Sequence, residues 1–291
     1  MILLTSMTGL RCGITGASGY VGSCIAKYLT ARGCVVLALG RGPSASIPFS
    51  LEAQPKVERL RGLDALIHCA FDFKPQKWED MRRINVEGST RLFRAAKDAG
   101  IKKIIFISTM SAFPGCTSNY GRAKLEIEEE ARKSGVFIIR PGLIYGKDAR
   151  SVFGKIRAIV NKFPAVPLID TGKRKLYLCH NQDLGALIYQ ICAGDLLSSD
   201  VPITAANETG FSFKDILKTM AHSSGKKLYF VPFPQFLLFF GLNASEKIGL
   251  NQGIRSDSFV SLLNLDPNPD FTVTKKSGVV FRPFSLETMN Q

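Results

Sequence analysis

The sequence predicts an α/β protein in which a doubly wound parallel sheet forms the main domain and a small C-terminal α/β lobe binds substrate. Short apolar runs alternate with helical patterns through the first half of the 291-residue chain, which is typical of βαβ units. After about residue 146 the segments shorten and prolines become frequent, which indicates a different architecture. We expect the main domain over residues 8–170, with a helix at about 183–193 packed back onto it, and the smaller lobe mainly over 171–291.

The first elements follow from their apolar spacing. "CGIT", 12–15, predicts a strand, and the helix after it carries Val21, Ile25 and Leu29 on one face and ends at Gly33. Apolar runs at 34–40 and 65–70 predict two buried strands. Between them "IPFSL" is long enough only for a short piece of strand.

The following elements alternate in the same way. Residues 79–100 have the spacing of one long helix, and 102–108 and 136–141 are expected to be strands. The charged helix between these strands, 121–134, ends at Gly135. For the returning helix near 183–193 we expect Asp183 as the N-cap. His68 and His180 are interpreted as buried structural histidines.

Composition narrows the class of partner. The chain has 38 Lys and Arg residues against 24 Asp and Glu, a net charge of +14, which favours anionic partners. The basic residues are scattered and no nucleic-acid reading motif accompanies them, so nucleic-acid binding is not expected. Seven cysteines without C-x-x-C spacing indicate reduced thiols in a cytoplasmic protein, and no metal-ligand spacing appears.

The apolar segments are too short for a membrane span. No run approaches the roughly 18 residues that a spanning helix needs, and "MILLTSM" lacks the basic region of a signal peptide. The most apolar stretch, "FLLFFGL" at 236–242, is interpreted as a core or dimer helix rather than a membrane contact. Whether Met1 or Met7 starts the physiological chain stays open.

The stretch "TGASGYVG", 15–22, has the features of a dinucleotide phosphate loop. It places three glycines at G-x-x-G-x-x-G spacing between the first strand and the first helix, where the backbone can approach a pyrophosphate and the helix N-terminus favours the anion. The sequence therefore predicts a bound dinucleotide held by Gly16, Ser18, Gly19, Tyr20 and Val21.

The end of the second strand selects between NAD and NADP. An acidic residue there binds the ribose 2′-hydroxyl of NAD, whereas an arginine accommodates the 2′-phosphate of NADP. This chain has Gly40 at the acidic position, Arg41 after it and Ser44 nearby. We predict NADP, with NAD as the alternative.

Six motifs in order resemble one enzyme family. "TGASGYVG", "DALIHCA", "NVEGSTRLFRAA", "IFIST", "YGRAK" and "IRPGLIYG" are similar to motifs of the extended short-chain dehydrogenase/reductases, in the NAD(P)-dependent epimerase/dehydratase branch. The resemblance covers about residues 10–190 and implies a Rossmann-type fold.

The resemblance also implies a catalytic set. Tyr120 would be the acid/base, and Lys124, one helical turn away, would favour its phenolate and bind the nicotinamide ribose. Thr109 would orient the substrate oxygen, with Ser108 and Ser111 as alternatives, and Asn85 would support the lysine through water. Two further cofactor contacts are implied where strands end, at Ala70 and Pro141. Arg140 is expected either to form an internal ion pair or to contact an anion.

The substrate is less defined than the chemistry. Thr109 and Tyr120 are only eleven residues apart, so the longer substrate loop of many family members is absent, and Leu143 stands where sugar epimerases often carry asparagine. The resemblance and the basic charge favour an oxidoreductase or epimerase acting on a nucleotide-activated sugar. The alternatives are a reductase of a non-sugar carbonyl and a non-catalytic dinucleotide sensor. A homodimer paired through the helices 78–100 and 121–134 is a further expectation.

Overall fold

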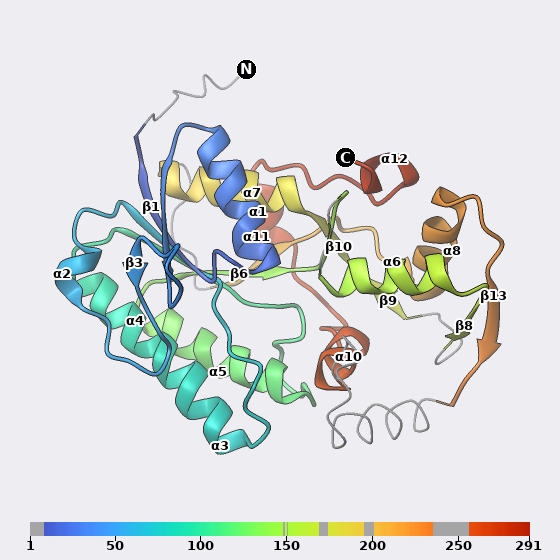
Figure 1. Cartoon of the computed structure of the whole chain (residues 1–291), viewed down its shortest axis with the longest axis horizontal. Helices are drawn as coiled ribbons and strands as arrows, with labels where there is room; N and C mark the ends of the chain where they lie inside the picture. The colour runs from blue at the N-terminus through green and yellow to red at the C-terminus, as the bar shows by residue number, and fades with distance from the viewer. Residues whose placement is uncertain (1–8, 148, 150, 169–173, 195–200, 235–255) are drawn as a thin grey trace.

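The main element of the fold is a seven-stranded parallel sheet (Figure 1). In this computed structural model the described residues are 9–147, 149, 151–168, 174–194, 201–234 and 256–291. The strand order is β11-β6-β5-β4-β1-β2-β3, and every neighbouring pair is parallel. The strands are β1 (Arg11–Thr15), β2 (Val35–Gly40), β3 (Ile47–Pro48), β4 (Ala65–His68), β5 (Lys103–Ile107), β6 (Phe137–Pro141) and β11 (Ile203–Ala205).

This strand order confirms the predicted Rossmann-type α/β fold and determines where a ligand can bind. The chain runs from β1 to β3 in one direction and then crosses to β4, which lies on the other side of β1. Ligands in open parallel sheets bind in the crevice beyond the strand ends at such a reversal. The carboxyl ends of β1 and β4 are therefore the place to look for a site.

Helices cover both faces of the sheet, as Figure 1 shows. Helices α1 (Tyr20–Ala31) and α7 (Asn181–Ala193) lie on one face, and α4 (Glu87–Asp98) and α5 (Asn119–Lys133) lie on the other. Along β5, Ile105 and Ile107 belong to the first apolar layer, whereas Ile104 and Phe106 belong to the second. This period of two explains why the strands read as uninterrupted apolar runs in the sequence.

The helix expected over 79–100 is divided into three parts. It begins as α3 (Trp78–Met81), widens into a π-helical turn, η1 (Arg82–Val86), and continues as α4. The Asn85 side-chain amide donates to the Met81 carbonyl at 3.2 Å, and this side-chain bond accompanies the wider turn. Short π segments of this kind often occur at functional sites.

The smaller lobe has a separate apolar core built from short elements. Helices α6 (Val152–Lys162) and α8 (Phe213–Ser223) pack together there. The remaining strands are β7 (Leu143–Tyr145), β8 (Ala165–Leu168), β9 (Lys175–Leu176), β10 (Leu178–His180), β12 (Phe211–Ser212) and β13 (Tyr229–Pro232). The later helices are α10 (Ser256–Leu263), α11 (Thr272–Lys276) and α12 (Leu286–Met289), whereas α2 (Val57–Leu60) packs against α4 of the main domain.

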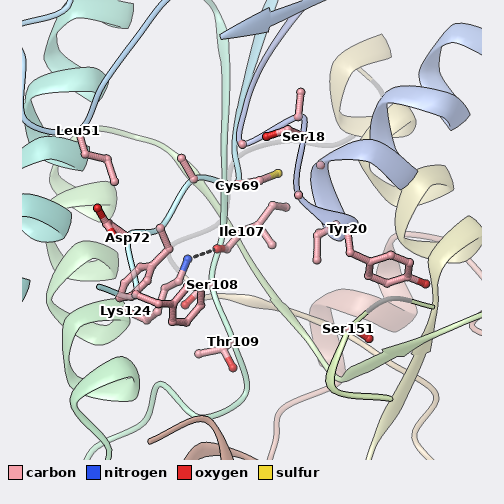
Figure 2. A pocket seen from close by; sticks show the side chains of 18 of the residues that line it. Ser18, Tyr20, Leu51, Cys69, Asp72, Ile107, Ser108, Thr109, Lys124 and Ser151 are labelled. Carbon is pink, nitrogen blue, oxygen red and sulfur yellow. Dashed lines mark hydrogen bonds between the residues drawn. The ribbon is translucent and has the colours of Figure 1, made fainter. Parts of the chain in front are cut away.

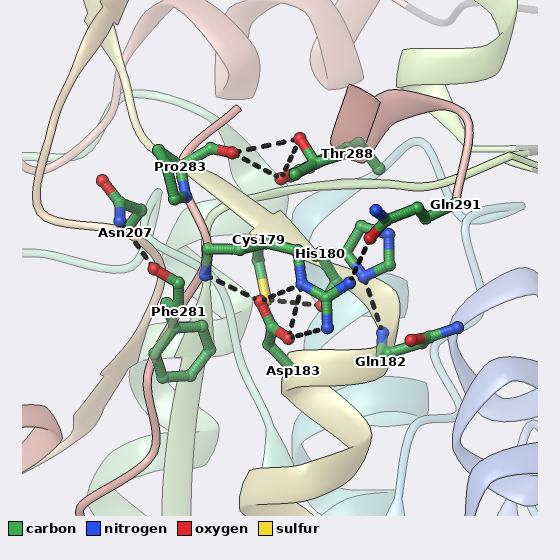
Figure 3. Close-up of polar contacts among 11 residues, drawn as sticks. Cys179, His180, Gln182, Asp183, Asn207, Phe281, Pro283, Thr288 and Gln291 are labelled. Carbon is green, nitrogen blue, oxygen red and sulfur yellow. Dashed lines mark hydrogen bonds and ion pairs between the residues drawn. The ribbon is translucent and has the colours of Figure 1, made fainter. Parts of the chain in front are cut away.

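The end of the chain returns to the main sheet, and an ion pair fixes it there. The Arg282 guanidinium donates to the Asp183 carboxylate at 2.9 Å, and Asn207 donates to the Phe281 carbonyl at 2.6 Å (Figure 3). The prediction that Asp183 caps α7 is wrong, because the N-cap is His180, whose ring nitrogen accepts from the Gln182 amide. The Asp183 carboxylate is occupied by Arg282 instead.

The cysteines and His68 are as the sequence predicts. All seven cysteines are free thiols, and His68 is fully buried with both ring nitrogens hydrogen-bonded, to Thr15 and Ser89. In the part of the chain that the structure describes, no helix combines the length and apolarity needed to cross a membrane. The apolar segment 236–242 and both candidate start residues lie outside the described residues. The division into residues 8–170 and 171–291 stays a prediction.

Candidate functional site

A cavity of about 650 Å³ opens at the carboxyl ends of the central strands, and its volume falls within the ~300–1,000 Å³ typical of small-molecule sites. Figure 2 shows part of its lining. Eleven predicted site residues line it, namely Gly16, Ser18, Gly19, Tyr20, Val21, Arg41, Ala70, Thr109, Tyr120, Lys124 and Pro141. Asn85 is not among the described residues that line the cavity.

The glycine loop forms one wall of the cavity at the start of α1. A Cβ on Gly22 would lie 2.3 Å from the Gly16 carbonyl oxygen, and one on Gly16 would lie 2.9 Å from the Ala70 nitrogen, so both positions need glycine. The N-cap of α1 is Gly19, and no described side chain caps this first turn. A helix start without a side-chain cap, facing a cavity, suits a pyrophosphate.

The end of β2 forms the far end of the same cavity. Gly40, Arg41 and Ser44 all line it. A Cβ on Gly40 would meet only the Ala45 Cβ, at 3.8 Å, so an acidic side chain would fit there. Arg41 therefore lies at the end of β2, where proteins of this fold contact either the ribose 2′-hydroxyl of NAD or the 2′-phosphate of NADP.

Helix α5 carries Tyr120 and Lys124 into the cavity from the opposite side. Lys124 is 2% exposed, and its Nζ donates to the Ile107 carbonyl at 2.7 Å, the bond drawn in Figure 2. The Nζ also lies 5.8 Å from the centre of the Tyr120 ring. Thr109, just after β5, lines the same cavity, and its hydroxyl is close enough to the Tyr120 phenol to affect the pKa of that phenol. The structure thus brings three of the four predicted catalytic side chains together in one cavity.

Two aromatic side chains that the sequence did not single out cover Tyr120. The Phe71 ring meets the Tyr120 ring edge-on at 5.0 Å between centroids, and the Phe73 ring stacks on it at 5.4 Å. Both belong to the segment that follows β4, where "FDF" comes directly after "IHCA". The sequence could have indicated these two residues, because they follow a strand whose carboxyl end was expected at the cofactor crevice.

Burial changes the pKa values of Tyr120 and Lys124. Desolvation raises the pKa of the Tyr120 phenol well above its usual value. The Thr109 hydroxyl opposes the rise in this pKa and the Asp257 charge adds to it. The predicted stabilisation of the phenolate by Lys124 stays a prediction. Burial also lowers the pKa of Lys124 to about 8, against the charges of Cys69 and Glu128. The phenol is therefore a proton donor at neutral pH.

The Asn85 side chain is buried and hydrogen-bonds the segment that carries the two aromatic rings. Its Oδ1 accepts from the Asp72 amide at 2.7 Å, and its Nδ2 donates to the Asp72 carbonyl at 2.9 Å. Asp72 lies between Phe71 and Phe73, so Asn85 holds the segment that covers Tyr120. The predicted role beside Lys124 stays a prediction, and the described contacts are with this segment.

Helix α10 closes the site from the C-terminal part of the chain. The Asp257 carboxylate accepts from the backbone amides of Asn119 and Tyr120, at 3.0 and 3.1 Å. The Ser261 hydroxyl donates to Ser118 at 2.9 Å. Helix α10 therefore contacts the short segment between Thr109 and Tyr120. Nothing in the local sequence near Asp257 indicated this contact.

A buried carboxylate connects the ends of the central strands. Glu128, one turn beyond Lys124, is fully buried and accepts from Ser108 at 2.6 Å and from Arg140 at 2.7 and 2.8 Å. Arg140 also lies 3.7 Å from Asp266. Of the two alternatives for Arg140, the structure supports the internal ion pair.

The depressed pKa of Lys124 predicts the pH dependence of carbonyl reduction. The ammonium stabilises the phenolate that forms on Tyr120, and it loses its proton as pH rises through about 8. The rate of reduction should therefore fall above that pH. Burial lowers the pKa values of His68 and His180 to about 3 and about 4, so neither titrates there. A kcat/KM profile that stays level through pH 8 would contradict this assignment.

Replacing Asp257 with asparagine tests the α10 contact. Removing the negative charge should lower the pKa of the Tyr120 phenol. In a plot of the alcohol oxidation rate against pH, the rising limb should therefore move to lower pH. Loss of part of a cap should lower the free energy of unfolding by about 1 kcal/mol. Asp215→Asn in the first turn of α8 is the control and should leave the limb in place. A limb that moves equally in both variants would refute the role of Asp257.

Comparison with known proteins finds similar epimerases and reductases. The chain is 26% identical over 235 residues to "Ceramide reductase" of Caulobacter vibrioides (strain NA1000 / CB15N), which covers 76% of this chain and 73% of the relative. It is 26% identical over 212 residues to the UDP-glucose 4-epimerase of Vibrio cholerae, covering 58% of this chain and 62% of that one. The solved structure of MoeE5 in complex with UDP-glucose and NAD has a TM-score of 0.65 at 20% identity, covering 76% of this chain and 85% of MoeE5.

A family model matches the part of the chain that runs from β1 to α7. The model of the NAD dependent epimerase/dehydratase family matches residues 12–195, which include the glycine loop, Thr109, Tyr120 and Lys124. The predicted family resemblance is confirmed. The chain therefore belongs to the NAD dependent epimerase/dehydratase family, whose members with similar sequence include epimerases and reductases.

Proposed function

We propose that this enzyme moves a hydride between NAD(P) and a carbon that carries a hydroxyl or carbonyl group. The observation that carries the proposal is that Tyr120, Lys124 and Thr109 share one cavity with the glycine loop. Glycine at positions 16 and 22 lets this loop fold tightly, because a Cβ at either position would collide with backbone atoms. When bound, the nicotinamide supplies or accepts the hydride.

The protein groups handle the proton. In the reduction direction Tyr120 gives its phenolic proton to the carbonyl oxygen, and in oxidation its phenolate takes the proton back. The positive charge of Lys124 stabilises the phenolate, which is costly in a desolvated site. Thr109, which lines the same cavity as the phenol, orients the substrate oxygen. Asn85 holds the Phe71–Phe73 cover in place through Asp72.

We propose NADP as the preferred cofactor, with NAD as the alternative. Arg41 and Ser44 at the cavity end supply the positive charge and hydroxyl that a 2′-phosphate requires. Gly40 leaves no carboxylate to bind a free 2′-hydroxyl. Gly19 and its neighbours in the loop would hold the pyrophosphate, while Ala70 and Pro141 would contact the rest of the dinucleotide.

For the substrate we propose a nucleotide-activated sugar that reacts through a keto intermediate. Similarity to a UDP-glucose 4-epimerase and to a protein solved with UDP-glucose supports this class. The net charge of +14 suits a pyrophosphate-bearing substrate. Epimerisation and keto-reduction share the step at Tyr120, so both reactions are compatible with the proposal.

A second candidate, a reductase of an apolar carbonyl compound, is favoured by the cavity lining. Apolar side chains dominate near Tyr120, and among the described lining residues the cations are Arg41 and Lys124. Both cations are assigned to the dinucleotide, so neither would lie beside the pyrophosphate of a nucleotide-sugar substrate. Similarity to a ceramide reductase supports this candidate. The apolar lining residues at this end are Phe71, Phe73, Leu143, Val152, Leu262 and Leu265.

A thermal-shift panel separates these proposals. It combines NADP(H) or NAD(H) with UDP-, GDP-, dTDP- and CDP-sugars, because a ligand that binds only the folded state raises the Tm. A further shift with one nucleotide sugar supports the first candidate. A shift with cofactor alone, together with oxidation of NADPH by an apolar ketone, supports the second. If no dinucleotide raises the Tm, the proposed hydride chemistry is refuted.

Two further proposals concern the setting of the enzyme. The seven free thiols are consistent with a cytoplasmic location. We also propose a homodimer paired through the helical segments 78–100 and 121–134, which light scattering on the purified protein would test.

A further inference from the structure

The small two-stranded sheet of the lobe has an apolar outer face. Strands β8 and β13 are parallel, with Tyr229 opposite Ala165 and Val231 opposite Pro167. Residues paired in this way have side chains on the same face. Tyr229 is 64% exposed, Val231 50% and Phe163 47%. The exposed apolar face therefore consists of Phe163, Ala165, Pro167, Tyr229, Val231 and Phe233.

The inner face of the same sheet is packed, so the outer face has a defined shape. Val166 and Leu168 alternate with the exposed residues and are buried, and Phe230 packs against the core of the lobe. Backbone bonds hold the two ends, from Tyr229 to Pro164 at 2.8 Å and from Phe233 to Leu168 at 3.1 Å. Large exposed apolar surfaces of this kind mark contact sites.

Three lysines lie at one end of this face. Lys162 precedes β8, and Lys226 and Lys227 precede β13, so the parallel strands place all three at one end of the sheet. The Lys162 Nζ lies 5.4 Å from the centre of the Phe163 ring, and Lys226 donates to the Asn161 carbonyl. Residues 152–168 and 211–234 contain seven Lys and Arg residues and a single acidic residue, Asp215.

We propose that the β8–β13 face binds the surface of an anionic lipid membrane. An apolar patch with lysines at one end matches the boundary between headgroups and acyl chains, where aromatic rings and long basic side chains are favoured. Figure 1 places β8 and β13 at the end of the molecule opposite α2 and β3. The face can therefore meet a membrane while the cofactor end of the cavity stays in water.

Charge selects a lipid surface over a second copy of the chain. Two copies joined through this face would bring two sets of lysines together, and like charges in contact oppose association. An anionic surface instead attracts each lysine, by about 1 kcal/mol per residue close to the membrane. The contact is peripheral and does not require a spanning helix.

Flotation with lipid vesicles tests the proposal on the full chain. Vesicles of phosphatidylcholine with phosphatidylglycerol should carry the protein, vesicles of phosphatidylcholine alone should not, and added salt should weaken the binding. The triple variant Tyr229→Ser, Val231→Ser and Phe233→Ser should reduce partitioning about tenfold or more. Lys162→Glu, Lys226→Glu and Lys227→Glu together should have a similar effect.

The controls separate this face from general charge and stability. Lys27→Glu, Lys97→Glu and Lys102→Glu together make the same charge change on the main domain, and Val280→Ser removes an 84% exposed apolar side chain elsewhere. Both should keep vesicle binding, and all variants should keep cofactor binding and Tm. If the two triple lysine variants lose vesicle binding equally, or if binding does not depend on phosphatidylglycerol, the proposal is overturned. Loss of a dimer in the serine variant would assign the face to a second copy and also overturn it.

Discussion

Replacing Tyr120 with phenylalanine is expected to lower turnover by about 10²–10⁴-fold, the usual contribution of a positioned acid or base. The change removes the only phenolic proton beside Thr109 in the described cavity and leaves the ring that Phe71 and Phe73 contact. Cofactor affinity should change little, because the glycine loop is untouched. Steady-state turnover and cofactor titration on the same preparation would measure both effects.

The matched control for this variant is Tyr189→Phe. Tyr189 lies on α7 in the apolar layer on the far side of the sheet, so its hydroxyl should not affect turnover. The comparison also separates an enzyme from a dinucleotide sensor, which would bind cofactor without depending on the phenol. Undiminished turnover in Tyr120→Phe would remove the catalytic assignment.

Changing Gly40 to aspartate and Arg41 to alanine is expected to reverse cofactor preference. The aspartate can accept from the free 2′-hydroxyl of NAD, and it repels the 2′-phosphate that Arg41 would otherwise bind. A Cβ at position 40 has room, with Ala45 at 3.8 Å, so the substitution should not disturb the strand. Each charged hydrogen bond is worth ~1.5–3 kcal/mol, and the ratio of the two Kd values should change by about 100-fold or more.

Binding of NADPH and NADH to the wild type and the variant, followed by fluorescence, would measure this ratio. Lys56→Ala is the control, because Lys56 is a nearby basic residue that lines an adjoining pocket but not the main cavity. It should leave the preference unchanged. A wild-type Kd for NADPH that is no lower than that for NADH would show that the prediction of NADP is wrong.

The sequence by itself determined six of the seven strands of the sheet, the glycine loop and the helix that carries Tyr120 and Lys124. Each of these depends on spacing along a short stretch of chain. The period of two in the strands and the glycines between β1 and α1 require particular backbone geometry. Tyr120 and Lys124 share a helix face because they are four residues apart. Eleven of the twelve predicted site residues line one cavity, and several of these, such as Thr109 and Pro141, were implied by the family resemblance.

Only the tertiary structure decided the surroundings of these residues. Asp257 binds the amide of Tyr120 from 137 residues away, and Asn85 hydrogen-bonds the Phe71–Phe73 segment through Asp72. The resemblance implied that Lys124 favours the Tyr120 phenolate, and the structure adds that burial raises the pKa of this phenol. Desolvation and long-range hydrogen bonds depend on which distant segments pack together, and no local pattern encodes that packing.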